Sequence, residues 1–254
     1  MIQQTLINSN ILLLELDNPP ANTLARATKK QMIKILEKIE QDAHLRAIII
    51  TGKGTTFCGG DDLKEAAQNA DEPQKIIENL RNFSAVINRF EAIEIPVIAA
   101  INGWCIGGGL ELALCCDIRI AVPHAKFVGA GVNVGLTASA FRLPRLIGVS
   151  RAKRLLLTGD TIDAKTALNY GLITDIFESN LIVSEAIKIA TAIATKAPLA
   201  IKSTKSIINQ ALNLEYNNGL ALQQQELEKL SMTSDYTTAL KAFTNKQKPN
   251  FEGK

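Results

Sequence analysis

Three consecutive glycines, Gly107 to Gly109, follow an apolar stretch that ends at Ile101, and the carboxylate of Glu111 comes two residues later. Glycine lets the backbone turn sharply and leaves its amides unshielded, so that a ligand can approach the start of the following helix. Free N–H groups beside the positive end of a helix dipole stabilise a developing oxyanion. The segment therefore predicts a catalytic site at which negative charge builds up on an oxygen atom.

A second glycine-rich turn, Gly52 to Gly60, follows the apolar stretch 47–51. It lacks the G-x-x-x-x-G-K-[ST] spacing of a phosphate loop and the third glycine of a dinucleotide-binding turn. Taken alone, it is a connection that Asp62 caps at the start of a helix. Two exposed amides from separate loops can also hold one oxygen atom between them, so the two turns together favour a functional site.

The composition is that of an ordinary soluble domain. The chain has 254 residues, of which 46% are hydrophobic and 21% charged, and a formal net charge of +3. The basic residues are scattered and follow no run interleaved with aromatics, so no nucleic-acid partner is expected. The apolar runs are too short to span a membrane and the start does not resemble a signal peptide, so we expect a cytoplasmic protein without a membrane partner.

The four cysteines form no C-x-x-C pair, and only two histidines, His44 and His124, could join them in a metal site. A zinc site is therefore not expected. Reduced, buried thiols of an intracellular protein explain the cysteines better than a disulfide framework does.

β-Branched runs alternate with helical patterns up to about residue 197, and after Pro198 the sequence is helical almost to its end. We therefore predict an α/β core over 1–197 and a helical region over 198–254, whose apolar faces need a partner. The expected strands are 2–7, 11–16, 47–51, 97–101, 118–121 and 173–177. The expected helices are 25–41, 76–91, 110–116, 150–157, 164–169, 183–196, 200–213, 222–230 and 234–245.

The segments 57–65 and 102–112 resemble the two signature motifs of the enoyl-CoA hydratase/isomerase (crotonase) superfamily, F-C-A-G-x-D-[LI]-K-E and N-G-x-x-x-G-G-G-x-E-L. The likeness extends from 18–24 to 248–251, essentially the whole chain. It implies a crotonase-like spiral of ββα units with a C-terminal helical trimerisation region, assembled as a homotrimer or hexamer. It also implies an acyl-CoA substrate and no separate cofactor, because the substrate carries the CoA.

The resemblance assigns the two oxyanion donors to the backbone amides of Asp61 and Gly108, where they would stabilise a thioester enolate. It assigns a catalytic role to Glu111. That carboxylate lies among apolar residues, and burying it is energetically costly unless it has a function. Burial would also suit it to acid–base catalysis. The substrate-binding residues that the resemblance implies are Ala21, Asn22, Leu24, Gly60, Asp61, Leu63, Lys64, Gly107, Gly108, Gly131 and Asn133.

The second glutamate of the hydratases is missing. Gly131, Asn133 and Ser139 stand at the three positions where the family carries a proton-shuttling acid. One hypothesis is that the side chain of Asp61 replaces it and forms an acid–base pair with Glu111. We expect the nearby Arg142 to anchor its segment rather than to react.

Three functions remain open at this point. Hydration of a 2-enoyl-CoA by Glu111, in fatty acid metabolism, is the default. A malonyl-type acyl-CoA decarboxylase is the rival enzyme, because an acid-poor pocket avoids repelling a departing carboxylate. A catalytically weak acyl-CoA-binding oligomer is the third reading.

Overall fold

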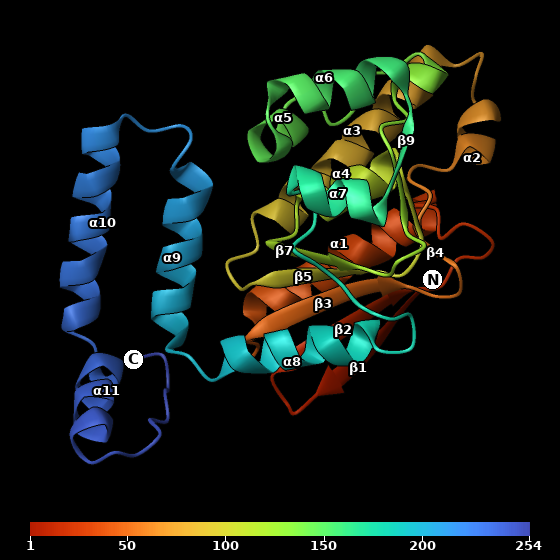
Figure 1. The fold of residues 1–254 in the computed structure, drawn as a ribbon. Helices are drawn as coiled ribbons and strands as arrows, with labels where there is room; N and C mark the ends of the chain where they lie inside the picture. The colour runs from red at the N-terminus through yellow and green to blue at the C-terminus, as the bar shows by residue number, and fades with distance from the viewer.

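A six-stranded sheet forms the centre of the molecule in this computed structural model, which describes residues 1–254 (Figure 1). The strand order is β1-β2-β3-β5-β7-β10, and only the first pair is antiparallel. The central strands are continuous apolar runs because parallel strands are covered on both faces. The strands are β1 (Ile2–Ile7), β2 (Ile11–Leu16), β3 (Ala47–Gly52), β5 (Val97–Ile101), β7 (Ile118–Ala121) and β10 (Asp175–Ile176).

A smaller sheet has the order β4-β6-β8-β9. Its strands are β4 (Thr56–Cys58), β6 (Trp104–Ile106), β8 (Lys126–Val128) and β9 (Thr161–Asp163). Each of β3, β5 and β7 leads directly into one strand of this sheet, and a helical segment follows. The chain therefore repeats a strand–strand–helix unit three times, which confirms the predicted spiral of ββα units.

Helices cover the sheets and surround the two glycine-rich turns (Figure 1). α8 packs against β2, β3, β5 and β7 of the larger sheet, and α1 packs against α3. None of the helices combines the length and the apolar character that crossing a bilayer requires. The helical segments of the core are α1 (Arg26–Gln41), α2 (Leu63–Ala67), α3 (Pro73–Glu91), α4 (Gly108–Leu114), the 3₁₀ turn η1 (Val132–Val134), α5 (Arg142–Ile147), α6 (Val149–Thr158), α7 (Ala164–Tyr170) and α8 (Ile182–Ala194).

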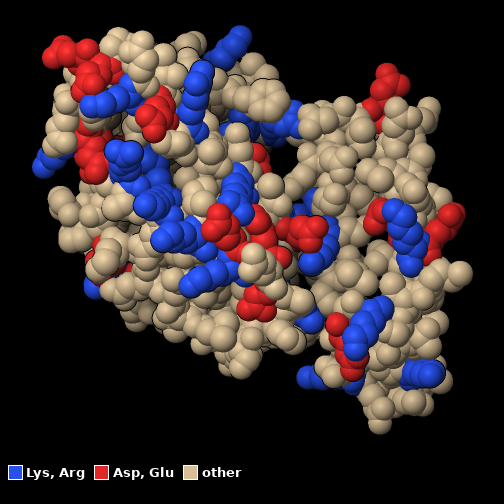
Figure 2. Space-filling model, turned by 180° about the vertical axis from the view of Figure 1, so that it is seen from behind, with Lys and Arg blue, Asp and Glu red and all other residues tan.

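Three C-terminal helices, α9 (Pro198–Gln210), α10 (Tyr216–Ser231) and α11 (Ser234–Thr244), stand beside this core (Figure 1). α9 is fastened to the core by Lys205, whose Nζ lies 2.7 Å from Asp117 Oδ2. Many apolar side chains of the three helices face outward, up to Phe243 at 86% exposure. Figure 2 shows few charged groups over much of this region, so its surface is suited to contact with another protein surface.

All four cysteines are free and buried, as predicted. Burial raises the pKa of the Cys58 and Cys116 thiols to about 12. Because the thiolate is the reactive form, these groups are shielded from electrophiles both by the surrounding protein and by their protonation.

We therefore expect the native protein to resist alkylation by iodoacetamide at pH 8, whereas all four cysteines react in denaturant. Mass spectrometry of the intact chain measures the number of adducts. Rapid labelling of Cys58 or Cys116 in the folded protein would contradict the burial of these residues.

Candidate active site

The two glycine-rich turns lie in contact because Gly59 and Gly60 follow β4, and Gly107 to Gly109 follow β6. These two strands are neighbours in the smaller sheet, where Cys58 pairs with Cys105. At Gly60 the backbone has a φ of +86°, and a Cβ there would lie 2.6 Å from the Gly108 nitrogen and 2.9 Å from the Ile106 oxygen. A side chain at position 60 would therefore separate the turns. Glycine at this position allows the segments that carry Asp61 and Gly108 to meet.

The backbone N–H groups of Asp61 and Gly108 have no hydrogen-bond acceptor within the chain. Both residues line a cavity with a volume of about 1430 Å³. Most backbone N–H groups of a folded protein are paired, so two free donors on adjoining turns are unusual. They are available to an acceptor that enters the cavity.

The segment 21–24 supports the turn that contains Gly59 and Gly60 through backbone hydrogen bonds. The N–H of Gly59 donates to the Ala21 oxygen at 2.8 Å, and that of Leu24 donates to the Gly60 oxygen at 2.7 Å. The amide of Asn22, which is buried, donates to the oxygen of Thr56. The structure thus places Ala21, Asn22 and Leu24 in the scaffold of the turn and outside the cavity lining.

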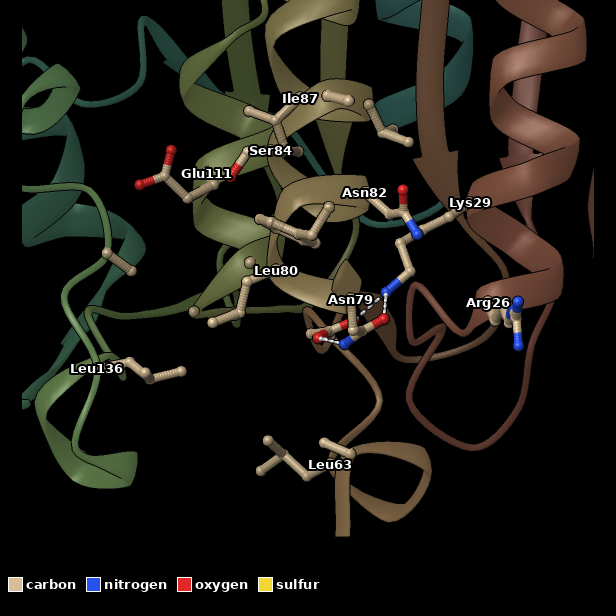
Figure 3. A pocket seen from close by; sticks show the side chains of 18 of the residues that line it. Arg26, Lys29, Leu63, Asn79, Leu80, Asn82, Ser84, Ile87, Glu111 and Leu136 are labelled. Carbon is tan, nitrogen blue, oxygen red and sulfur yellow. Dashed lines mark hydrogen bonds and ion pairs between the residues drawn. The ribbon is translucent and has the colours of Figure 1, made fainter. Parts of the chain in front are cut away.

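Glu111 lies in the first turn of α4 and is only 7% exposed. Its Oε2 accepts a hydrogen bond from Arg142 Nη1 at 3.0 Å, and its Oε1 accepts one from the backbone N–H of Ser139. Figure 3 shows the carboxylate among the side chains that line the cavity. A guanidinium and an amide donor both stabilise the ionised carboxylate.

Arg142 also binds Glu91, at 2.7 Å from its Nη2 to Oε2, and Asn88. The hydrogen bonds that Arg142 donates to Glu91, with the nearby charge of Glu111, hold the pKa of the Arg142 guanidinium above its usual range, against the effect of burial. Arg142 therefore anchors the start of α5 to α3 and α4, as expected, and fixes Glu111 in the process.

The side chain of Asp61 is held in a separate network. Lys29, which is 4% exposed, lies 2.6 Å from Asp61 Oδ1, and Asn79 Nδ2 donates to Asp61 Oδ2 at 2.7 Å. Lys29 also donates to Asn79 Oδ1, which closes the ring (Figure 3). No hydrogen bond joins the carboxylates of Asp61 and Glu111. This geometry argues against the acid–base pair expected from the sequence, because both oxygens of Asp61 already accept hydrogen bonds from Lys29 and Asn79.

The cavity has an apolar section near Glu111, to which Leu80, Phe83, Ile87 and Leu136 contribute. The Phe83 ring packs so closely on Gly108 that a Cβ there would lie 2.7 Å from Phe83 Cζ. Of the residues predicted from the sequence, those on the cavity wall are Asp61, Leu63, Gly107, Gly108, Glu111 and Gly131. Those outside the wall are Ala21, Asn22, Leu24, Gly60, Lys64 and Asn133.

Gly131 and Asn133 do not offer a second acid–base group. A Cβ at Gly131 would lie 2.8 Å from the Leu136 oxygen and 2.9 Å from the Ala138 nitrogen. The backbone of 136–138 therefore fills the space that a side chain at position 131 would take. Asn133 is directed away from the cavity, and its Nδ2 lies 3.4 Å from the oxygen of Gly159.

Sequence reasoning missed Lys29 and Asn79, which come from α1 and α3 and meet only in the folded chain. Lys29 did leave a signal. It lies three and seven residues before Met32 and Leu36, so helical spacing puts it on the buried face of α1. A lysine on such a face needs a partner, here Asp61.

Comparison with known proteins agrees with this fold. The family model described as enoyl-CoA hydratase/isomerase matches residues 6–254. The crystal structure of the enoyl-CoA hydratase from Bacillus anthracis superimposes with a TM-score of 0.95 at 34% identity, and covers 100% of this chain and 99% of that one.

Two curated relatives also match over nearly their whole length. The short-chain-enoyl-CoA hydratase of Clostridium acetobutylicum is 36% identical over 247 residues, which is 94% of this chain and 92% of that protein. The 2,3-dehydroadipyl-CoA hydratase of Escherichia coli is 32% identical over 256 residues, 96% of each. The chain belongs to the enoyl-CoA hydratase/isomerase family.

The turn before α2 depends on an ionised aspartate. Asp62 accepts hydrogen bonds from Thr23 and from the backbone N–H groups of Lys64 and Glu65, and Thr23 contributes most to holding the pKa of Asp62 below its usual value. A lowered pKa in the folded state adds stability above the pKa of the unfolded chain, near 4, and this stability is lost as the pH falls.

Replacing Asp62→Ala should therefore lower the free energy of unfolding by about 1 kcal/mol at pH 7, and by less at pH 3. Urea unfolding at the two pH values measures the difference, and Asp160→Ala, at an exposed residue, is the control. An equal loss at both pH values would mean that the charge of Asp62 is not what stabilises the turn.

Proposed function

We propose that the protein hydrates a 2-enoyl-CoA, with Glu111 as its single acid–base residue and the N–H groups of Asp61 and Gly108 as the oxyanion hole. The observation that carries this proposal is that one cavity is lined by a buried carboxylate and by two N–H groups without acceptors. Membership of the family supports the same reaction, and so do the activities for which the relatives are named. The substrate carries the CoA, and the proposed steps use no further cofactor.

In the first step Glu111 takes a proton from water while the water oxygen bonds to Cβ of the substrate. The π electrons of the double bond move through Cα towards the thioester oxygen, which becomes an enolate oxygen. The two N–H groups stabilise that charge, and one such donor is worth about 3–4 kcal/mol of the barrier. In the second step Glu111 returns the proton to Cα, so that one water molecule has been added in total.

Arg142 suits Glu111 to both steps. Its guanidinium, 3.0 Å from Glu111 Oε2, holds the carboxylate in place for a water molecule that enters the cavity. Once Glu111 is protonated, the same positive charge favours release of the proton to Cα. One carboxylate can therefore act first as a base and then as an acid.

The charge around Glu111 favours hydration over loss of CO₂ from a malonyl-type acyl-CoA. Glu111 and Glu91 share the single guanidinium of Arg142. A substrate carboxylate placed beside them would be a third negative charge against one positive charge. An uncharged enoyl group does not meet this repulsion.

We also propose that the apolar surface of α9, α10 and α11 is covered in a homotrimer or hexamer of the chain. The outward-facing side chains of these helices and the family resemblance support the assembly. Light scattering behind a sizing column should therefore give the mass of three or six chains of 27.5 kDa. A stable monomer would contradict the proposal.

Glu111→Gln should reduce kcat for hydration of crotonyl-CoA by about 100-fold or more, because the amide cannot accept the proton from water. The decrease in absorbance of the conjugated thioester measures the rate, and mass spectrometry identifies the hydrated product. Glu178→Gln, at an exposed residue, is the matched control and should keep full activity.

Three results would contradict the proposal. Full activity of Glu111→Gln would remove Glu111 from the mechanism. Loss of CO₂ from methylmalonyl-CoA, with no turnover of crotonyl-CoA, would instead support the decarboxylase. Tight binding of both esters without turnover would support an acyl-CoA-binding protein.

A further inference from the structure

The hydroxyl group of Ser139 is the one buried side-chain nitrogen or oxygen atom that has no hydrogen-bond partner. Ser139 is 4% exposed and lines the cavity that contains Glu111. Buried polar groups are almost always paired, so an unpaired hydroxyl on a cavity wall indicates a ligand that completes it.

The backbone at Ser139 is unusual as well. Its φ is +60°, in the left-handed region that residues other than glycine rarely adopt. In this conformation its N–H donates to Glu111 Oε1, and its carbonyl accepts from the N–H of Leu143 in the first turn of α5. Such strained residues concentrate at functional sites, where the surrounding structure holds them in place.

Both ends of this short segment are attached to the same carboxylate. Ser139 binds one oxygen of Glu111 through its N–H, and Arg142 binds the other through its guanidinium. A carboxylate has about four acceptor sites, so Glu111 can still accept a hydrogen bond from a small molecule. The Ser139 hydroxyl is fixed next to that carboxylate and has both its donor and its acceptor sites free.

Of the three positions where a second acid was expected, only Ser139 both has a polar side chain and belongs to a residue that lines the cavity. Gly131 has no side chain, and the backbone of 136–138 fills its surroundings. Asn133 is directed towards Gly159. The hydroxyl of Ser139 is therefore the group that can replace the second carboxylate as a hydrogen-bond partner, a role that does not require a charge.

We propose that the Ser139 hydroxyl binds the reacting water, and afterwards the 3-hydroxyl group of the product, in place of a second carboxylate. The water would donate one hydrogen to Glu111 and the other to Ser139 Oγ, which leaves a lone pair of its oxygen free for Cβ. Ser139 orients the water and transfers no net proton, so Glu111 remains the only acid–base residue. This inference rests on the proposed hydratase function.

Ser139→Ala removes the hydroxyl and keeps the backbone N–H that binds Glu111. We expect kcat for crotonyl-CoA to fall about 10- to 100-fold, because the water loses its orientation, while KM changes less than about threefold. The melting temperature should stay the same or rise, since an unpaired buried hydroxyl is removed. Ser139→Gly, which accepts a φ of +60° without strain, should lose as much activity as Ser139→Ala.

Ser150→Ala is the matched control, because it removes an exposed serine hydroxyl from a residue outside the cavity lining. It should keep kcat within about twofold. The proposal is overturned if Ser139→Ala also stays within twofold of the wild type. A marked drop in the melting temperature together with the loss of activity would overturn it as well, because the hydroxyl would then have a structural role.

A binding experiment tests the contact without turnover. Calorimetric titration compares 3-hydroxybutyryl-CoA, which carries the added hydroxyl group, with butyryl-CoA, which lacks it. Ser139→Ala should weaken binding of the hydroxylated ester about fivefold or more and leave butyryl-CoA within about twofold. An equal change for both esters would overturn the proposal.

The two proposals fail in different ways. If the wild-type protein hydrates no enoyl-CoA, the proposed function is wrong and the role of Ser139 falls with it. If the wild type hydrates crotonyl-CoA and Glu111→Gln abolishes this activity, but Ser139→Ala is unaffected, only the inference about Ser139 is wrong.

Discussion

The close approach of the two glycine-rich turns is the constraint on which the rest of the site depends. The Gly108 nitrogen lies so near Gly60 that a Cβ at Gly60 could not be accommodated. The approach is possible because β4 and β6 are neighbours in the smaller sheet, and because the segment 21–24 holds Gly59 and Gly60 through backbone hydrogen bonds. The packing of the core thus leaves two N–H groups, those of Asp61 and Gly108, free on one wall of the cavity.

Two charged networks lie on either side of this contact and hold the carboxylates apart. Lys29 and Asn79 bind the side chain of Asp61, and Arg142 binds Glu111. Asp61 pairs with Lys29, and Glu111 shares Arg142 with Glu91. The two carboxylates are therefore held by different partners, and the side chain of Asp61 helps to fix the loop whose backbone N–H has no acceptor.

The sequence predicted most of the fold, because long apolar runs and helical periodicity are local signals. The strands 2–7, 11–16, 97–101 and 118–121 agree with the structure to the residue. The short strands β4, β6, β8 and β9 were not predicted, since three residues carry too little pattern to be recognised. Yet these strands position the glycine-rich turns. The partners of the two carboxylates, Lys29 and Arg142, depend on tertiary contacts that no local pattern encodes.

The missing second glutamate is the point at which pattern and structure differ most instructively. Gly131 stands where the family carries an acid, and the backbone of 136–138 occupies the space beside it. The hydrogen bond from the Leu136 N–H to the Gly131 oxygen closes this loop. The same loop turns through the left-handed conformation of Ser139 and directs its N–H towards Glu111. The segment from Gly131 to Arg142 thus carries no second acidic side chain at these positions, and it supplies the N–H of Ser139 and the charge of Arg142 to the two oxygens of Glu111.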